Sequence, residues 1–334
     1  MVIVESYPLA VAMCFVTMLC WGSWANTQKL ASKAWPFQLF YWDYSLGVLL
    51  LSLALAFTMG SVGTTGRPFL ADLGQANTAP LVSAFLGGVV FNLSNILLVS
   101  AIDIAGLAVA FPLGVGLALV LGVVTSYAAK PEGNPKLLFM GVAAVALAIA
   151  LDAIAYRRLP AEGQKTTTKG IVLSIFSGVL MGFFYRFVVA AMSADFKNPE
   201  PGKLGPYTAV VAFSAGLLAS SFLWNSLVMV RPFAGHPVPF SAYFRKGTPR
   251  LHAIGLLGGL IWNTGMSFSV IASGAAGPAI SYGLGQGAAM VAALWGVFIW
   301  KEFRRAPPGT NPLLAWMFVL YAAGLGLLIA ARLV

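Results

Sequence analysis

Two asparagines are polar groups inside long apolar runs. Asn92 lies in "FLGGVVFNLSN" and Asn263 lies in "LLGGLIWNTGM". A carboxamide offers two N–H donors and a carbonyl acceptor, which is enough to recognise a neutral polar solute. The alternative role is an interhelical hydrogen bond worth about 0.6–2 kcal/mol. Because a polar group inside a long apolar run needs a partner or water, we favour solute binding for both.

Aromatic side chains near these asparagines could provide flat surfaces for the same solute. Trp21 and Trp24, in "CWGSWANTQKL" (20–30), are spaced for one face of a helix. A tryptophan at a helix end is usually an interfacial anchor, but Trp21 lies well inside its run. An indole can stack on a planar heterocycle or on the C–H face of a sugar. Other residues predicted to complete a cavity wall are Trp262, Thr264, Tyr282 and Gln286.

Two opposite charges, Lys29 and Asp43, fall where one apolar run ends and the next begins. If both runs are helices, the two side chains lie at the same depth and could form a salt bridge that locks a gate. A carboxylate that alternates between a buried site and a lysine can also carry a proton. A static ion pair is the alternative. Tyr41 and Tyr44 flank Asp43, and we expect them to hydrogen-bond to it.

Arg186 lies deep in a later run, in "MGFFYRF". An arginine there cannot easily extend its charge to the cytoplasm. It is either a substrate or counter-ion residue, or it reaches the outer interface, and we favour the first role.

Signatures of catalysis are weak. The two histidines, His236 and His252, have no cysteine or carboxylate at metal-ligand spacing. The segment "GQKTTTKG" (163–170) lacks the residue order of a phosphate-binding loop. We therefore expect no enzymatic activity, no metal and no cofactor, and an ion gradient as the energy source.

The composition defines the class of protein. Of 334 residues, 59% are hydrophobic and 9% are charged, which leaves too little polar surface for a soluble globule. A bilayer-spanning helix needs about 20 apolar residues, and no cleavable signal peptide is evident. The predicted spans, within a few residues, are 7–29, 38–59, 80–101, 104–127, 136–156, 169–190, 204–229, 250–273, 275–299 and 312–332.

The distribution of basic residues predicts the topology. If ten spans alternate, thirteen of the 20 Lys and Arg fall on one side. Cytoplasmic loops are enriched in these residues, so both termini are predicted outside. The net charge of +10 is then a topology signal and indicates no nucleic-acid partner. The thirteen are Lys29, Lys33, Arg157, Arg158, Lys165, Lys169, Arg231, Arg245, Lys246, Arg250, Lys301, Arg304 and Arg305.

The two halves of the chain resemble each other. Residues 85–130 align without a gap on 256–301 at an offset of 171, which matches Asn92 with Asn263 and brings several glycines into register. A unit of five spans enters the membrane inverted in its second copy, as in secondary transporters. We predict an all-α membrane protein of two inverted five-helix repeats, 1–158 and 169–334, joined by a linker at 159–168. The alternative is a duplicated scaffold without transport.

Matched glycine-rich segments in the fourth and ninth spans are predicted hinges. Pro112 frees a backbone carbonyl, and its counterpart is Gly283. A pure packing role for the glycines is the alternative. The predicted hinge residues are Pro112, Gly114, Gly116, Gly283, Gly285 and Gly287.

The stretches "FYWDYSLGVLLLSLALAFTMGSVG" (40–63), "FLADLGQAN" (69–77) and "GGVVFNLSNILLVSAIDIAGLAVA" (87–110) resemble the ureide permease family of the drug/metabolite transporter superfamily. The resemblance is best over residues 10–156. It implies ten helices, alternating access and proton-coupled uptake of allantoin, uracil and similar heterocycles, and it adds Asn95 to the substrate residues. The short central loop suggests a bacterial homologue in the cytoplasmic membrane.

Neighbouring families in that superfamily transport glucose, ribose or rhamnose, so a monosaccharide remains an alternative substrate. An exporter of lipophilic compounds is a further alternative. We predict a secondary active importer whose partners are a small polar solute, protons and the lipid bilayer, acting as a monomer or homodimer. The central site is predicted to contain Asn92, Asn263, Trp21, Trp262 and Gln286.

Overall fold

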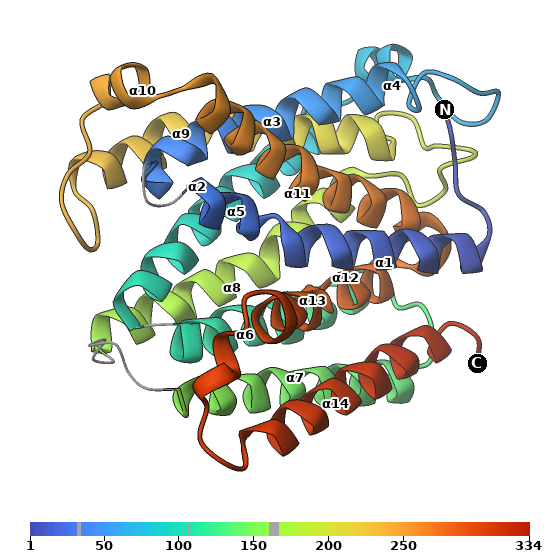
Figure 1. The fold of residues 1–334 in the computed structure, drawn as a ribbon. Helices are drawn as coiled ribbons and strands as arrows, with labels where there is room; N and C mark the ends of the chain where they lie inside the picture. The colour runs from blue at the N-terminus through green and yellow to red at the C-terminus, as the bar shows by residue number, and fades with distance from the viewer. Residues whose placement is uncertain (32–34, 106, 160–166) are drawn as a thin grey trace.

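The computed structural model describes residues 1–31, 35–105, 107–159 and 167–334 (Figure 1). Those residues are helical or irregular, and ten helical segments are long and apolar enough to cross a membrane. This confirms the predicted fold class. Lys33, Lys165 and most of the predicted linker lie outside the described residues.

The spans follow the predicted order, and two of them are interrupted. The spans are α1 Tyr7–Ser23 with α2 Ala25–Ala31, α3 Phe37–Phe57, α5 Thr78–Ala105, α6 Leu107–Ala129, α7 Pro135–Arg157, α8 Thr168–Ala191, α9 Pro206–Val230, α11 Pro249–Ala276, α12 Pro278–Gly285 with α13 Ala288–Leu294 and the π-helix η1 Trp295–Ile299, and α14 Thr310–Ala330. Short helices lie between spans: α4 Phe69–Gln75, α10 Ser241–Lys246 and the 3₁₀ helix η2 Glu302–Arg305.

Local sequence explains where several helices begin. Pro135, Pro206 and Pro249 open α7, α9 and α11, where the missing N–H costs no helical hydrogen bond. Asn134 accepts a hydrogen bond from the N–H of Lys136 at 3.0 Å and caps α7. Within each span the apolar run satisfies its backbone through the helix itself, as a bilayer requires.

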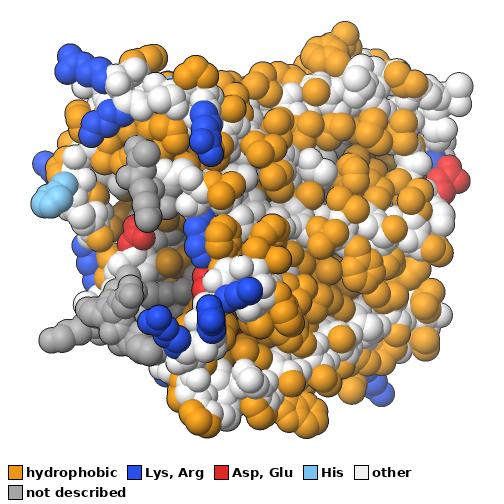
Figure 2. Space-filling model, viewed as in Figure 1, with side chains coloured by type: hydrophobic (Ala, Val, Ile, Leu, Met, Phe, Trp, Pro, Cys, Tyr) orange, Lys and Arg blue, Asp and Glu red, His pale blue; other side chains and the backbone are white. Residues whose placement is uncertain are grey.

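The two ends of the helical bundle differ in charge. Both termini lie at the right of Figure 1, while α2 and α10 lie at the left. Lys and Arg side chains gather at that left end, and hydrophobic side chains cover most of the remaining face (Figure 2). We call the left end, which carries Lys29, Arg157 and Arg250, the basic end. The end that carries both termini is the terminal end.

The third span of each half packs on the first two spans of the other half. α5 packs against α8 and α9, and α11 packs against α1 and α3. A Cβ atom at Gly88 would collide with the carbonyl oxygen of Phe213, and one at Gly259 with that of Tyr44. These matched glycines allow close helix approach. The contacts thus follow the internal repeat that the sequence predicts.

The two predicted hinge segments differ in shape. α6 continues through Pro112, with Gly114 against Leu98 and Gly116 near Ile149. In the second half, Gln286 and Gly287 interrupt the span between α12 and α13. There the N–H of Gly287 donates to the carbonyl of Leu284 at 3.0 Å, a tighter turn than an α-helix makes. Gly283 packs near Val123 and Leu328 within α12.

Candidate solute-binding cavity

A cavity of about 330 Å³ lies between helices of both halves. Its volume is within the range typical of small-molecule sites. The cavity extends from the middle of the bundle toward the basic end, where the exposed residue Asp103 lines it. Its aromatic lining comprises Trp21, Trp24, Phe91, Phe184 and Trp262, and its polar lining comprises Gln28, Asn95, Asp103 and Gln286.

Trp21 is held in the cavity wall by two glycines. A Cβ atom on Gly265 would lie 2.6 Å from the Trp21 ring, and one on Gly285 would lie 2.8 Å from it. The indole N–H donates to the carbonyl of Trp262 at 3.2 Å. The two indoles are nearly parallel, with ring centroids 6.0 Å apart. Trp21 is therefore a fixed surface within the bundle, and its position differs from that of an interfacial anchor.

An aromatic cluster borders the deep part of the cavity. Phe91 lies 4.4 Å from Trp262 between ring centroids, and Phe184 lies 5.0 Å from Phe91. Phe213 stacks on Trp262 at 5.9 Å. Phe213 is in the second turn of α9, which begins at the terminal end. The cluster thus packs the space between the cavity and the terminal end.

The polar side chains of the cavity wall differ in whether they have a hydrogen-bond partner. The Asn95 amide donates to the hydroxyl of Tyr41 at 3.3 Å. Gln286 is 6% exposed and lines the cavity, and its carboxamide forms no hydrogen bond to another described residue. Its donors and acceptor are therefore available to a ligand or to water in the cavity. Gln286 is therefore the strongest candidate in the cavity for recognition of a polar solute.

Asn92 and Asn263, both predicted to bind the solute, do not line this cavity. The Asn92 amide donates to the carbonyl of Leu217 at 3.1 Å and to the hydroxyl of Ser220 at 2.8 Å. The Asn263 amide donates to the carbonyl of Val48 at 2.9 Å. Each asparagine follows the close-packed glycine by one helical turn, so it faces the crossing helix and forms an interhelical hydrogen bond.

Tyr282 and Arg186 also lie apart from the cavity. Tyr282 is fully buried and donates to the carbonyls of Met181 at 3.1 Å and Ala118 at 3.3 Å. Arg186 is exposed and lines a surface hollow at the terminal end together with Glu200. Five turns of α8 separate Arg186 from the basic end, so it takes the alternative position at the opposite interface.

The predicted salt bridge between Lys29 and Asp43 is also corrected, because each charge has another partner. Lys29 Nζ lies 2.7 Å from Glu302 Oε1. Both carboxylate oxygens of Asp43 lie 3.0 Å from Nδ1 of His252, and Tyr243 donates a short hydrogen bond to Oδ1. The pKa of Tyr243 is raised above its ordinary value of 10.0. Burial is the larger cause, and the neighbouring Asp43 carboxylate is the second.

Within the described part of the chain, neither Tyr41 nor Tyr44 forms a hydrogen bond with Asp43. Tyr41 accepts from Asn95, and the Tyr44 ring packs against Trp24 with centroids 4.9 Å apart. Residues one or two positions away on a helix point in different directions from Asp43. Both tyrosines thus support the cavity wall through Asn95 and Trp24.

Several residues of the cavity wall were not predicted from the sequence. Phe91, Phe184 and Gln28 line the cavity, and Gln28 lies in the same polar segment as Trp21 and Trp24. A conspicuous polar segment could therefore have indicated Gln28.

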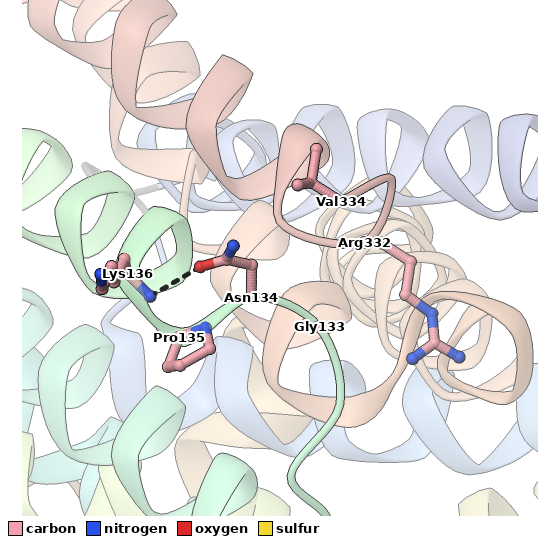
Figure 3. Close-up of a pocket in the computed structure, with 6 residues that line it drawn as sticks. All are labelled: Gly133, Asn134, Pro135, Lys136, Arg332 and Val334. Carbon is pink, nitrogen blue, oxygen red and sulfur yellow. Dashed lines mark hydrogen bonds between the residues drawn. The ribbon is translucent and has the colours of Figure 1, made fainter.

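A second hollow lies beside the C-terminus and has a volume of about 580 Å³ (Figure 3). Lys136 and Arg332 border it, but their side chains point in different directions. Arg332 forms an ion pair with Glu132 at 3.0 Å. The charged groups of this hollow therefore do not converge, whereas the lining of the central cavity combines aromatic and polar side chains.

Comparison with known proteins identifies the family. The family model for ureide permeases matches residues 40–165 and 157–331. The chain belongs to the ureide permease family. Ureide permease 2 of Arabidopsis thaliana is 25% identical over 397 aligned residues, and ureide permease 1 of the same plant is 23% identical over 388. Each alignment covers 99% of both chains.

A shorter match has higher identity. Probable ureide permease A3 of Vigna unguiculata is 31% identical over 169 residues, covering 49% of this chain and 45% of that protein. A known crystal structure superposes with a TM-score of 0.60 at 18% identity, covering 98% of this chain and 99% of the other, which supports the fold alone. The protein is therefore an integral membrane permease and is not an enzyme.

Proposed function

We propose that the protein is a secondary active importer of ureides or related N-heterocycles, of the allantoin or uracil type, driven by protons through alternating access. The observation that carries this proposal is the carboxamide of Gln286, which lines an aromatic cavity and forms no hydrogen bond to another described residue. The relatives named ureide permeases support the substrate class. Among the alternatives from the sequence, this family membership favours ureides over sugars.

The cavity chemistry suits a small, neutral and planar solute. Ureides and uracil carry adjacent N–H and C=O groups, which match the donors and acceptor of a carboxamide. The rings of Trp24, Phe91 and Trp262 offer flat faces on which a heterocycle can stack. Gln286 and Gln28 would read the polar edge of the solute, and Asn95 would contribute its remaining carbonyl acceptor.

We place the basic end in the cytoplasm, because cytoplasmic loops are enriched in Lys and Arg. Both termini then lie outside the cytoplasmic membrane of a bacterial cell, and the cavity faces inward. The repeats 1–158 and 169–334 would move against each other in transport. The interruption at Gln286–Gly287 would be the hinge of the second repeat, with Pro112 and Gly114 in the first.

The Asp43 cluster is a candidate inner gate. Asp43 joins α3 to α11 through His252 and to α10 through Tyr243. Opening and closing of the basic end would require these contacts to break and form. A carboxylate paired with a histidine can also exchange a proton, so proton coupling at Asp43 remains part of the proposal.

Uptake into proteoliposomes tests the substrate class. We expect radiolabelled allantoin or uracil to accumulate when the lumen is more alkaline than the medium. We expect no accumulation after a protonophore is added, and none in liposomes without protein. Accumulation of glucose, ribose or rhamnose with no ureide uptake would move the function to the sugar alternative. Uptake that does not depend on the pH gradient would exclude proton coupling.

A matched pair of variants tests the role of Gln286. Gln286→Leu should weaken binding of the transported ureide about 10- to 100-fold, because a hydrogen-bonding pair worth about 1–3 kcal/mol is lost. The control is Gln38→Leu, since Gln38 lies on α3 and does not line the cavity. Isothermal titration with purified protein measures both dissociation constants. An equal effect of both substitutions would exclude Gln286 from the site.

A further inference from the structure

Asp152 is a buried carboxyl group on α7, near the basic end. The residue is 5% exposed, and its Oδ1 atom has no hydrogen-bond partner among the described residues. An ionised carboxylate that is buried without a partner costs several kcal/mol, so such a group binds a proton instead. Neither the solute cavity nor the Asp43 cluster includes Asp152.

The groups that face Asp152 strengthen this requirement. Glu302 from η2 repels a negative charge on Asp152. The Tyr156 hydroxyl donates to Glu302 Oε2 at 2.7 Å, and Lys29 lies 2.7 Å from Glu302 Oε1. The hydroxyl of Tyr321, on α14, is buried without a hydrogen-bond partner among the described residues. Glu302 is therefore satisfied as an anion, whereas the described surroundings of Asp152 stabilise its neutral form.

Two backbone irregularities hold Glu302 in this position. The π-helix η1 covers Trp295–Ile299, and Gly296 within it leaves room for Tyr156 and Glu302. Lys301, directly before Glu302, has a φ of 54°, which is unusual for a residue with a side chain. π-Helical turns and left-handed backbone conformations occur preferentially at functional sites. The position of Glu302 thus depends on two backbone conformations that are less favourable than a regular α-helix.

The same segment is connected to the wall of the solute cavity. Trp295 of η1 donates to the hydroxyl of Ser23 at 2.9 Å, and Trp300 donates to Oδ1 of Asn26 at 2.7 Å. Ser23 and Asn26 flank Trp24, which lines the cavity. A change in charge at Asp152 can therefore act through Glu302 and η1 on the helix that contacts the solute.

We propose that Asp152 is a proton-binding residue of the transport cycle, linked to the solute cavity through Glu302 and η1. This inference rests on the proposed function, in which a proton moves with the solute. A proton taken up from water outside the membrane forms the O–H bond on a carboxyl oxygen of Asp152, and this bond breaks when the proton is released to water at the basic end. Glu302, whose side chain is 30% exposed, and Tyr156 connect Asp152 to that end.

Infrared difference spectra of the purified protein, recorded against pH without any solute, test the proton site directly. A buried protonated carboxyl gives a C=O stretch that a carboxylate lacks. We expect one such band to disappear in Asp152→Asn and to persist in the matched control Asp43→Asn. Glu302→Gln should change the pH at which the band appears, because a neighbouring charge is lost. A band that is unchanged in both Asp152→Asn and Glu302→Gln would overturn the proposal.

Transport assays then separate this inference from the proposed function. Asp152→Asn should lose at least 10-fold in accumulation driven by a pH gradient while it retains ureide exchange between equal concentrations. Full accumulation in Asp152→Asn would remove Asp152 from coupling but leave the permease function intact. Absence of ureide exchange in the wild-type protein would instead contradict the proposed function. If Asp152→Asn does not fold, the band shift in Glu302→Gln still decides the inference.

Discussion

Two carboxyl groups near the basic end have similar burial and opposite surroundings. Asp43 is 2% exposed and Asp152 is 5% exposed. Asp43 has His252 and Tyr243 as hydrogen-bonding partners from two other helices. Asp152 has an oxygen without a partner in the described chain and a second acid, Glu302, as its neighbour. Burial alone therefore does not determine what a membrane carboxyl does, because the partners decide which protonation state is stable.

The internal repeat sharpens this comparison. Tyr44 lies against Gly259 as Phe213 lies against Gly88, so Tyr44 and Phe213 are counterparts in the repeat. The residues directly before them, Asp43 and Ala212, are then counterparts as well. The offset of 171 makes Leu81 the counterpart of His252. The polar contact that joins α3 to α11 is thus replaced by apolar residues between α9 and α5. A gate based on charge is present at the basic end, and aromatic packing around Phe213 occupies the other side of the cavity.

The largest expected difference concerns stability. Asp43→Ala leaves the hydroxyl of Tyr243 and the ring of His252 without their acceptor, so the free energy of unfolding should fall by about 3 kcal/mol. Asp152→Ala removes a group that lacks a partner, so the change should stay below about 1 kcal/mol. Reversible unfolding in mixed micelles at neutral pH measures both. Equal losses would show that Asp152 has a stabilising partner and would end the distinction.

Removal of His252 should give Asp43 the surroundings of Asp152, with a smaller loss of stability. His252→Ala removes the cationic or donor partner of Asp43 and leaves Tyr243, so stability should fall by about 1.5–3 kcal/mol. The isolated Asp43 carboxyl should then bind a proton as we propose for Asp152, and a second carboxyl band should appear in infrared spectra. His236→Ala is the matched control, since His236 is exposed in a loop. No new band in His252→Ala would mean that Tyr243 alone stabilises the Asp43 carboxylate.

The helices were predictable because each span is a continuous apolar run with proline or charge at its ends. Trp21, Trp262 and Gln286 were predictable in the cavity, since bulky or polar groups within such runs need a special environment. The role of Asn92 was not, because a carboxamide that binds solute and one that joins two helices look the same in sequence. Only the Gly88 contact shows which side of the helix faces the neighbour.

The partners of the charged residues were the least predictable part of the structure. Asp43 and His252 are 209 positions apart, and Tyr156 and Glu302 are 146 apart. Lys29 was expected at the same depth as Asp43, but its helix directs it toward η2 and Glu302. Pairings between distant helices depend on how the helices cross, and a single sequence does not contain that geometry.

The smallest expected effect isolates one hydrogen bond of the Asp43 cluster. Tyr243→Phe should reduce stability by about 1 kcal/mol, the usual net value of such a bond. Because the pKa of Tyr243 is raised in the folded protein, its contribution is complete below the ordinary value of 10.0 and is lost as the pH rises above it. The difference between wild type and Tyr243→Phe should therefore stay constant around neutral pH and shrink only under strongly alkaline conditions. A difference that already changes near neutral pH would show that another group of the Asp43 cluster exchanges a proton there, and would make the cluster a second site of proton exchange beside Asp152.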